Sequence, residues 1–199
     1  LLTIQEVLRR TCIGFEIVSQ GRNFVVMREI SKAEKEEFEQ VMRRAFLFVL
    51  NMAEECHEAA KKEDEHGLQS IPLMDDSVNR YTDFCRRLLN KEERVYAGPW
   101  YYLSEQLERL GDLYASLAKE LAGKKLSKLQ LQLFAAVNGF LRQFYDVFYK
   151  FDLEKMETLH GSYVSLRKKF AAEKGEMLLL ARILENTFEM NGALLVLHL

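Results

Sequence analysis

Glu108 and Asp112 stand four residues apart, with Gly111 between them, in a segment whose apolar residues recur every three or four positions. In a helix, residues four apart share one face, and a glycine lets another group approach the backbone closely. Like charges at this spacing repel each other unless water or a cation screens them. The pair therefore predicts either an ordinary solvated helix face or a site whose hard oxygen ligands suit a divalent or ferric ion.

A second metal-binding pattern occurs elsewhere in the chain. Glu54 and His57 stand three residues apart, and Glu157 and His160 repeat that spacing. Glu-x-x-His is the element that di-metal carboxylate bundles take from two of their helices, together with one glutamate from each of two others. A ferritin-like di-metal carboxylate protein is therefore an alternative for this chain.

The sequence contains no pattern for nucleophilic catalysis or nucleotide hydrolysis. It has no Gly-rich phosphate loop, no Ser-His-Asp order and no Gly-x-Ser-x-Gly elbow. The 28 Lys and Arg residues against 30 Asp and Glu leave a net charge of −2, which disfavours direct binding of nucleic acid. We therefore expect a binding protein and not an enzyme.

Cysteine usage and hydropathy predict the compartment. The three cysteines, Cys12, Cys56 and Cys85, form no Cys-x-x-Cys pair, which indicates a reduced, cytoplasmic protein. The longest purely apolar run, residues 45–50, is far short of the roughly 20 residues that a membrane span needs. We therefore expect no membrane insertion and no secretion signal. Because the first residue is Leu1 and not Met, we expect the chain to be part of a longer one.

Apolar residues at helical spacing predict a helical body from residue 31 to the end, and hence an all-α fold class. Ser31 and Glu34 have the spacing of a capping box, and Gly67, Pro72 and Gly123 mark predicted connections. The predicted helices cover residues 31–62, 74–90, 98–121, 127–150, 153–173 and 176–199.

Residues 1–31 have a different pattern. Residues 3–10 carry apolar residues at helical spacing, which predicts a short helix. Apolar and polar residues then alternate over 13–17, and a second apolar run follows a turn-forming stretch at 24–27. This arrangement predicts a β-hairpin at about 12–28.

A lone hairpin cannot bury its own apolar face, and its strand edges are open to further pairing. The hairpin therefore predicts self-association or docking on a partner. The helix predicted over 127–150 carries aromatic residues on more than one face and would be the second contact. A homodimer is the simplest expected result.

Leu107 to Asp112, with the sequence LERLGD, resembles the third-helix signature of the PhoU family. In that family an acidic residue, three intervening residues and an aspartate bind metal, and two three-helix repeats form the fold. The resemblance implies a metal site at Glu108 and Asp112. Residues 76–80, in the second predicted helix, also resemble the equivalent segment of that family.

The sixth predicted helix offers a counterpart of this signature over residues 184–189. The resemblance implies a second pair of metal ligands there, Glu185 and Glu189. This segment departs from the family pattern, because Asn186 stands in place of the usual basic residue and Phe188 in place of a small one. Its last residue is a glutamate where the family has aspartate.

The resemblance also implies the domain organisation and the function. Two PhoU-like repeats would cover residues 32–123 and 124–199, after the segment 1–31. Residues 8–18 resemble the stretch that precedes the repeats in archaeal phosphate-uptake regulators, where an AbrB-like DNA-binding domain stands further upstream. The two Glu-x-x-His motifs would fall on helices that are not equivalent in these repeats, which disfavours the di-metal alternative.

The function implied by this resemblance is regulation of phosphate uptake and phosphate-responsive signalling. The chain would act by binding a metal ion of unknown identity and a protein partner of the transport or signalling system. DNA binding would belong to a part of the protein outside this chain. Regulation of another ion-transport system is an alternative.

Overall fold

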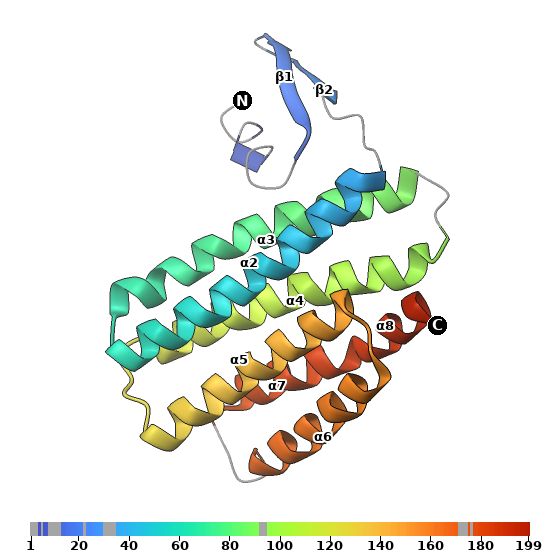
Figure 1. The fold of residues 1–199 in the computed structure, drawn as a ribbon. Coiled ribbons are helices and arrows are strands. Elements are labelled where there is room, and N and C mark those ends of the chain that lie inside the picture. The colour runs from blue at the N-terminus through green and yellow to red at the C-terminus, as the bar shows by residue number, and fades with distance from the viewer. Residues whose placement is uncertain are drawn as a thin grey trace.

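The computed structural model of the chain is mostly helical, with an antiparallel β-hairpin at its N-terminal end (Figure 1). The structure describes residues 4, 6–7, 13–21, 23–29, 35–91, 95–170, 175 and 177–199. The predicted helical class and the predicted hairpin are both confirmed. The predicted capping box at residues 31–34 and most of the short helix predicted over 3–10 lie outside the described residues.

The hairpin consists of β1 (Phe15–Gln20) and β2 (Val25–Glu29). The strands pair in an antiparallel register that brings Phe15 opposite Glu29, with an irregularity between Ile17 and Ser19. The backbone N–H of Gly21 donates to the carbonyl of Phe24 at 2.9 Å and closes the turn.

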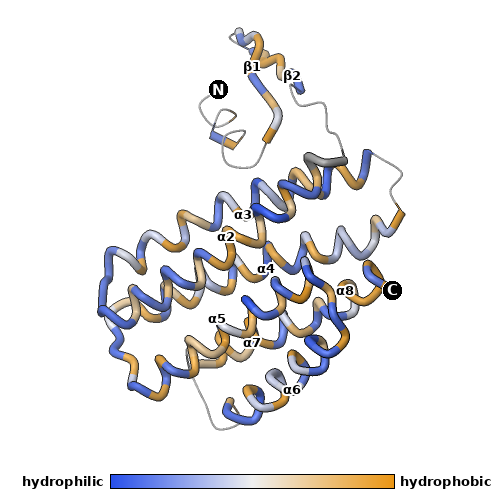
Figure 2. Tube along the Cα trace, viewed as in Figure 1, coloured by the Kyte–Doolittle hydropathy of each residue, from blue (hydrophilic) through white to orange (hydrophobic). Residues whose placement is uncertain are grey.

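The helices follow in the order of the chain. They are α2 (Lys35–Lys62), α3 (Glu65–Lys91), α4 (Ala97–Leu121), α5 (Lys128–Tyr149), α6 (Leu153–Lys169), α7 (Met177–Glu189) and α8 (Asn191–His198). Figure 2 shows hydrophobic and hydrophilic residues alternating along them with a short period, as expected for helices with one buried and one exposed face. Gly123, with a φ of 73°, follows α4 in a conformation that suits glycine and ends the helix as predicted.

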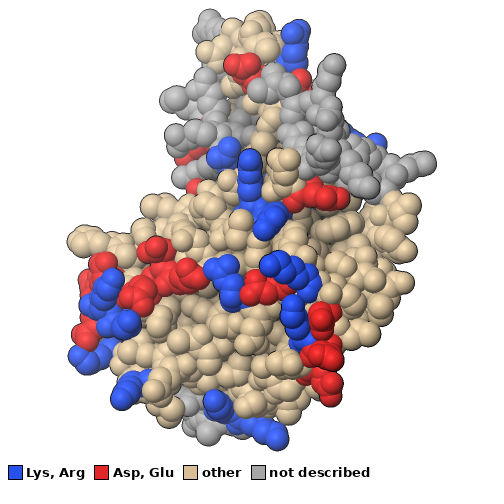
Figure 3. Space-filling model, in the orientation of Figure 1, with Lys and Arg blue, Asp and Glu red and all other residues tan. Residues whose placement is uncertain are grey.

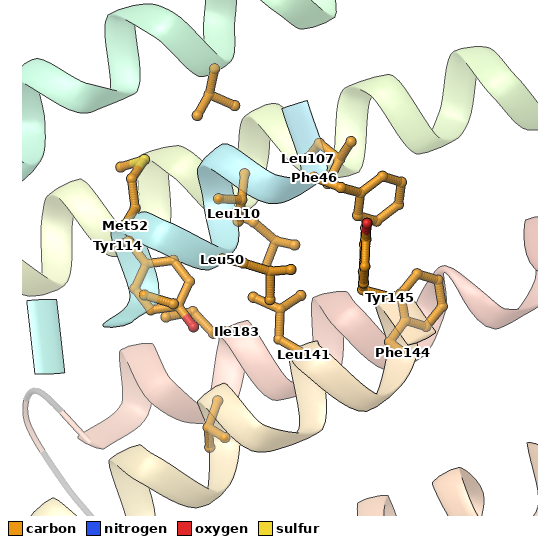
Figure 4. Close-up of a cluster of buried hydrophobic side chains, with 14 of the residues drawn as sticks. Phe46, Leu50, Met52, Leu107, Leu110, Tyr114, Leu141, Phe144, Tyr145 and Ile183 are labelled. Carbon is orange, nitrogen blue, oxygen red and sulfur yellow. The ribbon is translucent and has the colours of Figure 1, made fainter. Parts of the chain in front are cut away.

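α2, α3 and α4 pack against one another, while α5 contacts α2, α6 and α7. Contacts of α4 with α7 and α8 join the first three helices to the last ones. One hydrophobic core therefore runs through both halves of the helical body. Figure 4 shows side chains of α2, α4, α5 and α7 pointing toward one another in this core, including Phe46, Leu110, Phe144 and Ile183. Because the core is continuous, the division into repeats at 32–123 and 124–199 stays a prediction.

The predicted connection around Gly67 and Pro72 is wrong, because both residues lie inside α3. Asp64 stabilises the first turn, since its Oδ1 accepts a hydrogen bond from the Gly67 N–H at 3.0 Å. A side chain at position 67 would collide with that carboxylate, so the glycine belongs to the turn. Leu68 and Ile71 are buried, and their burial offsets part of the roughly 3 kcal/mol that a proline costs inside a helix.

The last predicted helix is also corrected, because the segment 176–199 is divided into α7 and α8. The break lies at Met190, whose side chain is fully buried. Leu194 is buried as well, and α8 packs on α4. α7 and α8 thus both pack on α4, and the single residue Met190 between them keeps a backbone conformation close to helical.

Candidate functional site

Glu108 and Asp112 lie on α4 beside its buried stripe. Leu107, Leu110 and Tyr114 are fully buried in the core. Glu108 is half-buried and Asp112 is exposed, next to the contact between α4 and α3. The apolar stripe therefore orients α4 so that its acidic pair lies near the side chains of α3.

Asp75 of α3 occupies the space left by Gly111. A Cβ atom at position 111 would lie 2.3 Å from Asp75 Oδ1, which is closer than any side chain tolerates. Burial raises the pKa of Asp75 to about 6, and the nearby charges of Asp112 and Glu108 add to this increase. The structure thus places a third carboxylate beside the predicted pair.

Two buried oxygen atoms beside this pair lack hydrogen-bond donors. Asn79 Nδ2 donates to Asp75 Oδ2 at 3.3 Å. Asp75 Oδ1 and Asn79 Oδ1 accept no hydrogen bond from the described residues. A buried acceptor without a donor costs about 1–3 kcal/mol. Carboxylate and amide oxygens are ligand types that hard divalent cations accept, so the residue types present here are compatible with a metal ion.

Arg86 of α3 already neutralises part of the acidic surface. Its guanidinium donates to Asp83 Oδ1 at 2.7 Å and also to the carboxylates of Glu105 and Glu108. Burial lowers the pKa of Arg86, but these hydrogen bonds outweigh burial and hold the pKa above its ordinary value. Glu108 is therefore paired with an arginine and would have to leave it to bind a metal.

Within the part of the chain that the structure describes, no three side chains of His, Cys, Asp and Glu converge into a set that would hold a metal ion. Asp75 and Asp112 are close enough to influence each other electrostatically. A metal bound beside these two carboxylates would therefore need water or further groups to complete its shell.

The second predicted pair has different surroundings. Glu185 and Glu189 are both exposed on α7. Glu185 Oε1 lies 3.9 Å from Arg167 Nε of α6. Glu189 lies near Tyr102 of α4, whose pKa is raised by burial and by this carboxylate. The first pair thus faces α3, whereas the second lies toward α6 and the first half of α4.

Phe188 lies where Gly111 lies in the first pair, one residue before the second carboxylate. Its ring stacks on Tyr163 of α6, with ring centroids 3.7 Å apart and planes inclined by 4°. In α7 this aromatic stack therefore occupies the position that corresponds to the open space at Gly111 of α4. The structure therefore provides no equivalent of Asp75 at Phe188.

Three of the four residues of the Glu-x-x-His motifs have separate partners, and the fourth, Glu157, is exposed. Glu54 Oε1 accepts a hydrogen bond from Arg142 of α5 at 2.8 Å. His57 Nε2 lies 3.2 Å from the carbonyl oxygen of Leu131, also on α5. His160 packs against an aromatic ring of α7. Because these side chains are engaged on different helices, the described residues do not assemble the site that a di-metal protein requires.

Sequence analysis did not identify Asp75, Asn79 or Arg86 as parts of this site. Asp75 and Asn79 have the same four-residue spacing as the acidic pair of α4, so the spacing alone was a usable signal. The helix that carries them was predicted to begin only at about residue 74, at the very edge of this pair. No spacing in the sequence indicates that Arg86 would bind Glu105 and Glu108 of another helix.

Comparison of the chain with models of protein families, with curated proteins and with solved structures finds no match. Among the helices that the structure describes, none is long and apolar enough to cross a membrane.

Proposed function

We propose that this chain is a PhoU-like regulator of phosphate uptake and phosphate-responsive signalling. It acts by binding a metal ion and a protein partner and catalyses no reaction. The observation that carries the proposal is the half-buried carboxylate of Asp75, whose buried Oδ1 enters the space at Gly111 near Asp112. The resemblance of the LERLGD segment to the PhoU signature supplies the link to phosphate.

The metal ion would stabilise the ionised form of Asp75. Without a cation, burial and neighbouring charges disfavour ionisation of this group. A divalent or ferric ion held by Asp75, Asn79 and Asp112 would reverse that effect and would tie α3 to α4. Metal binding would then be coupled to the packing of these helices and to the charge that they present to a partner.

The hairpin is the proposed docking surface for a protein of the transport or signalling system. Arg87 of α3 holds its base, because the guanidinium donates to the carbonyl of Ile13 and lies 4.7 Å from the ring centroid of Phe15. The large apolar side chains of Phe24 and Val26 are about half exposed. An anchored base with an exposed apolar tip is suited to contact another protein.

The proposed compartment is the cytoplasm. The thiols of Cys56 and Cys85 are both buried, and burial raises the pKa of Cys56 to about 12. Such thiols are protected from oxidation and are compatible with a reducing environment.

The metal site is tested by calorimetric titration of the parent chain with Mg²⁺, Mn²⁺ and Fe³⁺, together with thermal unfolding. We expect a metal that binds to raise the unfolding temperature of the parent. Asp112→Asn should reduce this response, whereas the matched control Asp146→Asn, an exposed aspartate of α5, should preserve it. If the parent binds none of these ions, the metal part of the proposal is wrong.

The regulatory role is tested in cells of the source organism. Removal of the gene should change phosphate uptake and leave potassium uptake unaltered. The parent gene should restore the original uptake. A change confined to potassium would instead identify the chain as a regulator of another ion-transport system.

A further inference from the structure

α5 and α6 enclose a shallow groove on the outside of the helical body. One hollow in it has a volume of about 500 Å³ and is lined by Gly139, Gln143, Gly161 and Ser165, among others. A second hollow of about 450 Å³ shares Gln143 and continues the groove toward Lys155. The second hollow is also lined by the charged residues Asp146 and Lys150. Figure 3 shows an uncharged surface in the lower half of the molecule, with acidic and basic side chains around it.

Both walls of this groove contain a glycine inside a helix. Gly139 of α5 and Gly161 of α6 are exposed, and a Cβ atom added to either would meet no atom within 4 Å. Glycine is the least favourable helix residue apart from proline. Since no described atom of this chain needs the space, the two glycines would be of use to a backbone that approaches from outside.

One face of α6 is polar, exposed and arranged by charge. Glu154, Glu157, Gly161, Ser165 and Lys168 recur at steps of three or four residues and are all exposed; we call them the α6 face. Gly161 lies at the middle of the helix, with the glutamates on its N-terminal side and the lysine on its C-terminal side. This face of the helix therefore has a negative end and a positive end, with a glycine between them.

We propose that the α6 face binds the α6 face of a second copy of this chain, with the two helices antiparallel and crossing at Gly161. A two-fold axis through that crossing brings Glu154 of each copy opposite Lys168 of the other. The absence of a side chain at Gly161 lets the two backbones approach closely, and Gly139 leaves room on the adjoining wall of the groove.

A second copy fits this face better than an unrelated helix because the charges are self-complementary. When the helices run antiparallel, the contact between Glu154 and Lys168 of the other copy forms twice, once on each side of the two-fold axis. α6 also buries few residues of its own, chiefly Leu159 and Leu166, while Leu153 and Val164 at its edges are exposed. Association would cover these apolar side chains as well.

This dimer is independent of the metal site. α6 packs on α5 and α7, whereas the acidic site lies between α3 and α4. A chain that binds no metal would still associate through α6. The proposal also differs from association through the hairpin, which would leave the groove open.

Sedimentation analysis of charge variants tests the pairing directly. Lys168→Glu should weaken dimerisation by on the order of tenfold, because like charges then oppose each other at two symmetric places. The double variant Glu154→Lys with Lys168→Glu restores opposite charges and should recover the parent affinity. Lys119→Glu, an exposed lysine of α4, is the control and should leave the dimer intact.

Cross-linking tests the crossing point. Gly161→Cys, in a chain that also carries Cys12→Ser, should form a disulfide-linked dimer on mild oxidation, since Cys56 and Cys85 are buried. Gly192→Cys, at another exposed helical glycine, should not. Three results would overturn the proposal. The parent could be a monomer, or the double variant could fail to recover association. The dimer could also be abolished by Phe24→Ser in the hairpin but not by Lys168→Glu.

Discussion

α4 and α7 carry the same spacing of carboxylates and use it differently. In α4, Gly111 between the two acidic residues lets Asp75 enter from α3. In α7, Phe188 occupies the corresponding position and stacks on Tyr163 of α6. Carboxylate spacing therefore does not create a site by itself. The residue between the carboxylates decides whether a further oxygen ligand can approach.

The residue after the first glutamate sharpens this contrast. Arg109 of α4 is exposed, whereas Asn186 of α7 is buried. Asn186 Nδ2 donates to the carbonyl oxygen of Gln106 at 3.1 Å and so joins α7 to α4. Asn186 and Phe188 of α7 thus both pack against neighbouring helices, whereas Arg109 of α4 stays exposed.

The largest expected effect comes from filling the space at Gly111. Gly111→Leu would force Asp75 to move, because a Cβ atom there lies 2.3 Å from its Oδ1. The rest of the leucine side chain would also need space beside Val78, which that Cβ atom already contacts at 3.4 Å. Overpacking of this kind costs about 1–3 kcal/mol, of which the better helix propensity of leucine recovers at most about 1. We expect chemical denaturation to show a net loss of about 2 kcal/mol, together with loss of any stabilisation by metal.

Gly192→Leu is the matched control for this substitution. Gly192 is helical and exposed, and a Cβ atom there meets no atom within 4 Å. We expect its unfolding free energy to be unchanged or slightly higher than that of the parent. If Gly111→Leu behaves like this control, the space at Gly111 has no structural role and the comparison of α4 with α7 fails.

Asp75→Asn tests the charge that occupies this space. The pKa of Asp75 is raised from 3.8 to about 6 in the folded chain, so the folded state binds the proton more tightly than the unfolded state does. Its contribution to stability is therefore greatest below pH 4 and is lost as the pH rises from about 4 to 6. The asparagine variant lacks this loss.

At pH 7 we expect Asp75→Asn to be more stable than the parent by roughly 1 kcal/mol. This difference is smaller than the free energy that corresponds to the full pKa shift, because the Asp75 side chain is only partly buried and solvent screens its charge. The advantage should vanish at pH 4. Urea denaturation at both pH values measures the difference. Equal differences at the two pH values would show that Asp75 is not perturbed by its surroundings.

The helical pattern of the chain made most of the fold predictable. Stripes such as Leu107, Leu110 and Tyr114 identify buried faces because apolar burial repeats every three or four residues. Pro72 misled the assignment of α3, since its local penalty is outweighed by Asp64 at the helix start and by buried neighbours. The break at Met190 comes directly before Asn191 and Gly192, two residues of low helix propensity that the prediction of one helix over 176–199 did not take into account.

The acidic pair of α4 was visible in the sequence, whereas its neighbours were not. A helical period shows which residues share a face, but not which helix lies opposite. The contact of Asp75 with Gly111, and that of Arg86 with Glu108, both join α3 to α4 over long sequence separations. Such contacts are set by the tertiary packing of the helices.

Arg86→Gln examines the competition between the resident arginine and a metal. The substitution removes the counter-charge of Asp83, Glu105 and Glu108. Because these carboxylates are partly exposed, we expect a loss of at most about 1 kcal/mol in unfolding free energy. Metal affinity should rise, since Glu108 becomes available as a ligand. Calorimetric titration measures this change.

Arg142→Gln is the control for Arg86→Gln because Arg142 pairs with Glu54, away from the acidic site. It should leave metal affinity unchanged. Equal metal affinities for Arg86→Gln and the parent would show that the arginine does not compete with the metal.

The smallest effects are expected at Glu185 and Glu189, which the PhoU resemblance predicts as a second pair of ligands. Both are exposed, and Glu185 lies 3.9 Å from Arg167, a distance at which a surface ion pair contributes little. Replacing either by Gln should change the unfolding free energy by no more than about 0.5 kcal/mol. The metal response should also be that of the parent, because Phe188 excludes a third ligand from α6. Thermal unfolding with and without metal measures both quantities. The opposite result would be that Glu185→Gln or Glu189→Gln loses the metal response while Asp75→Asn keeps it. In that case the metal site would lie on α7 and not on α4.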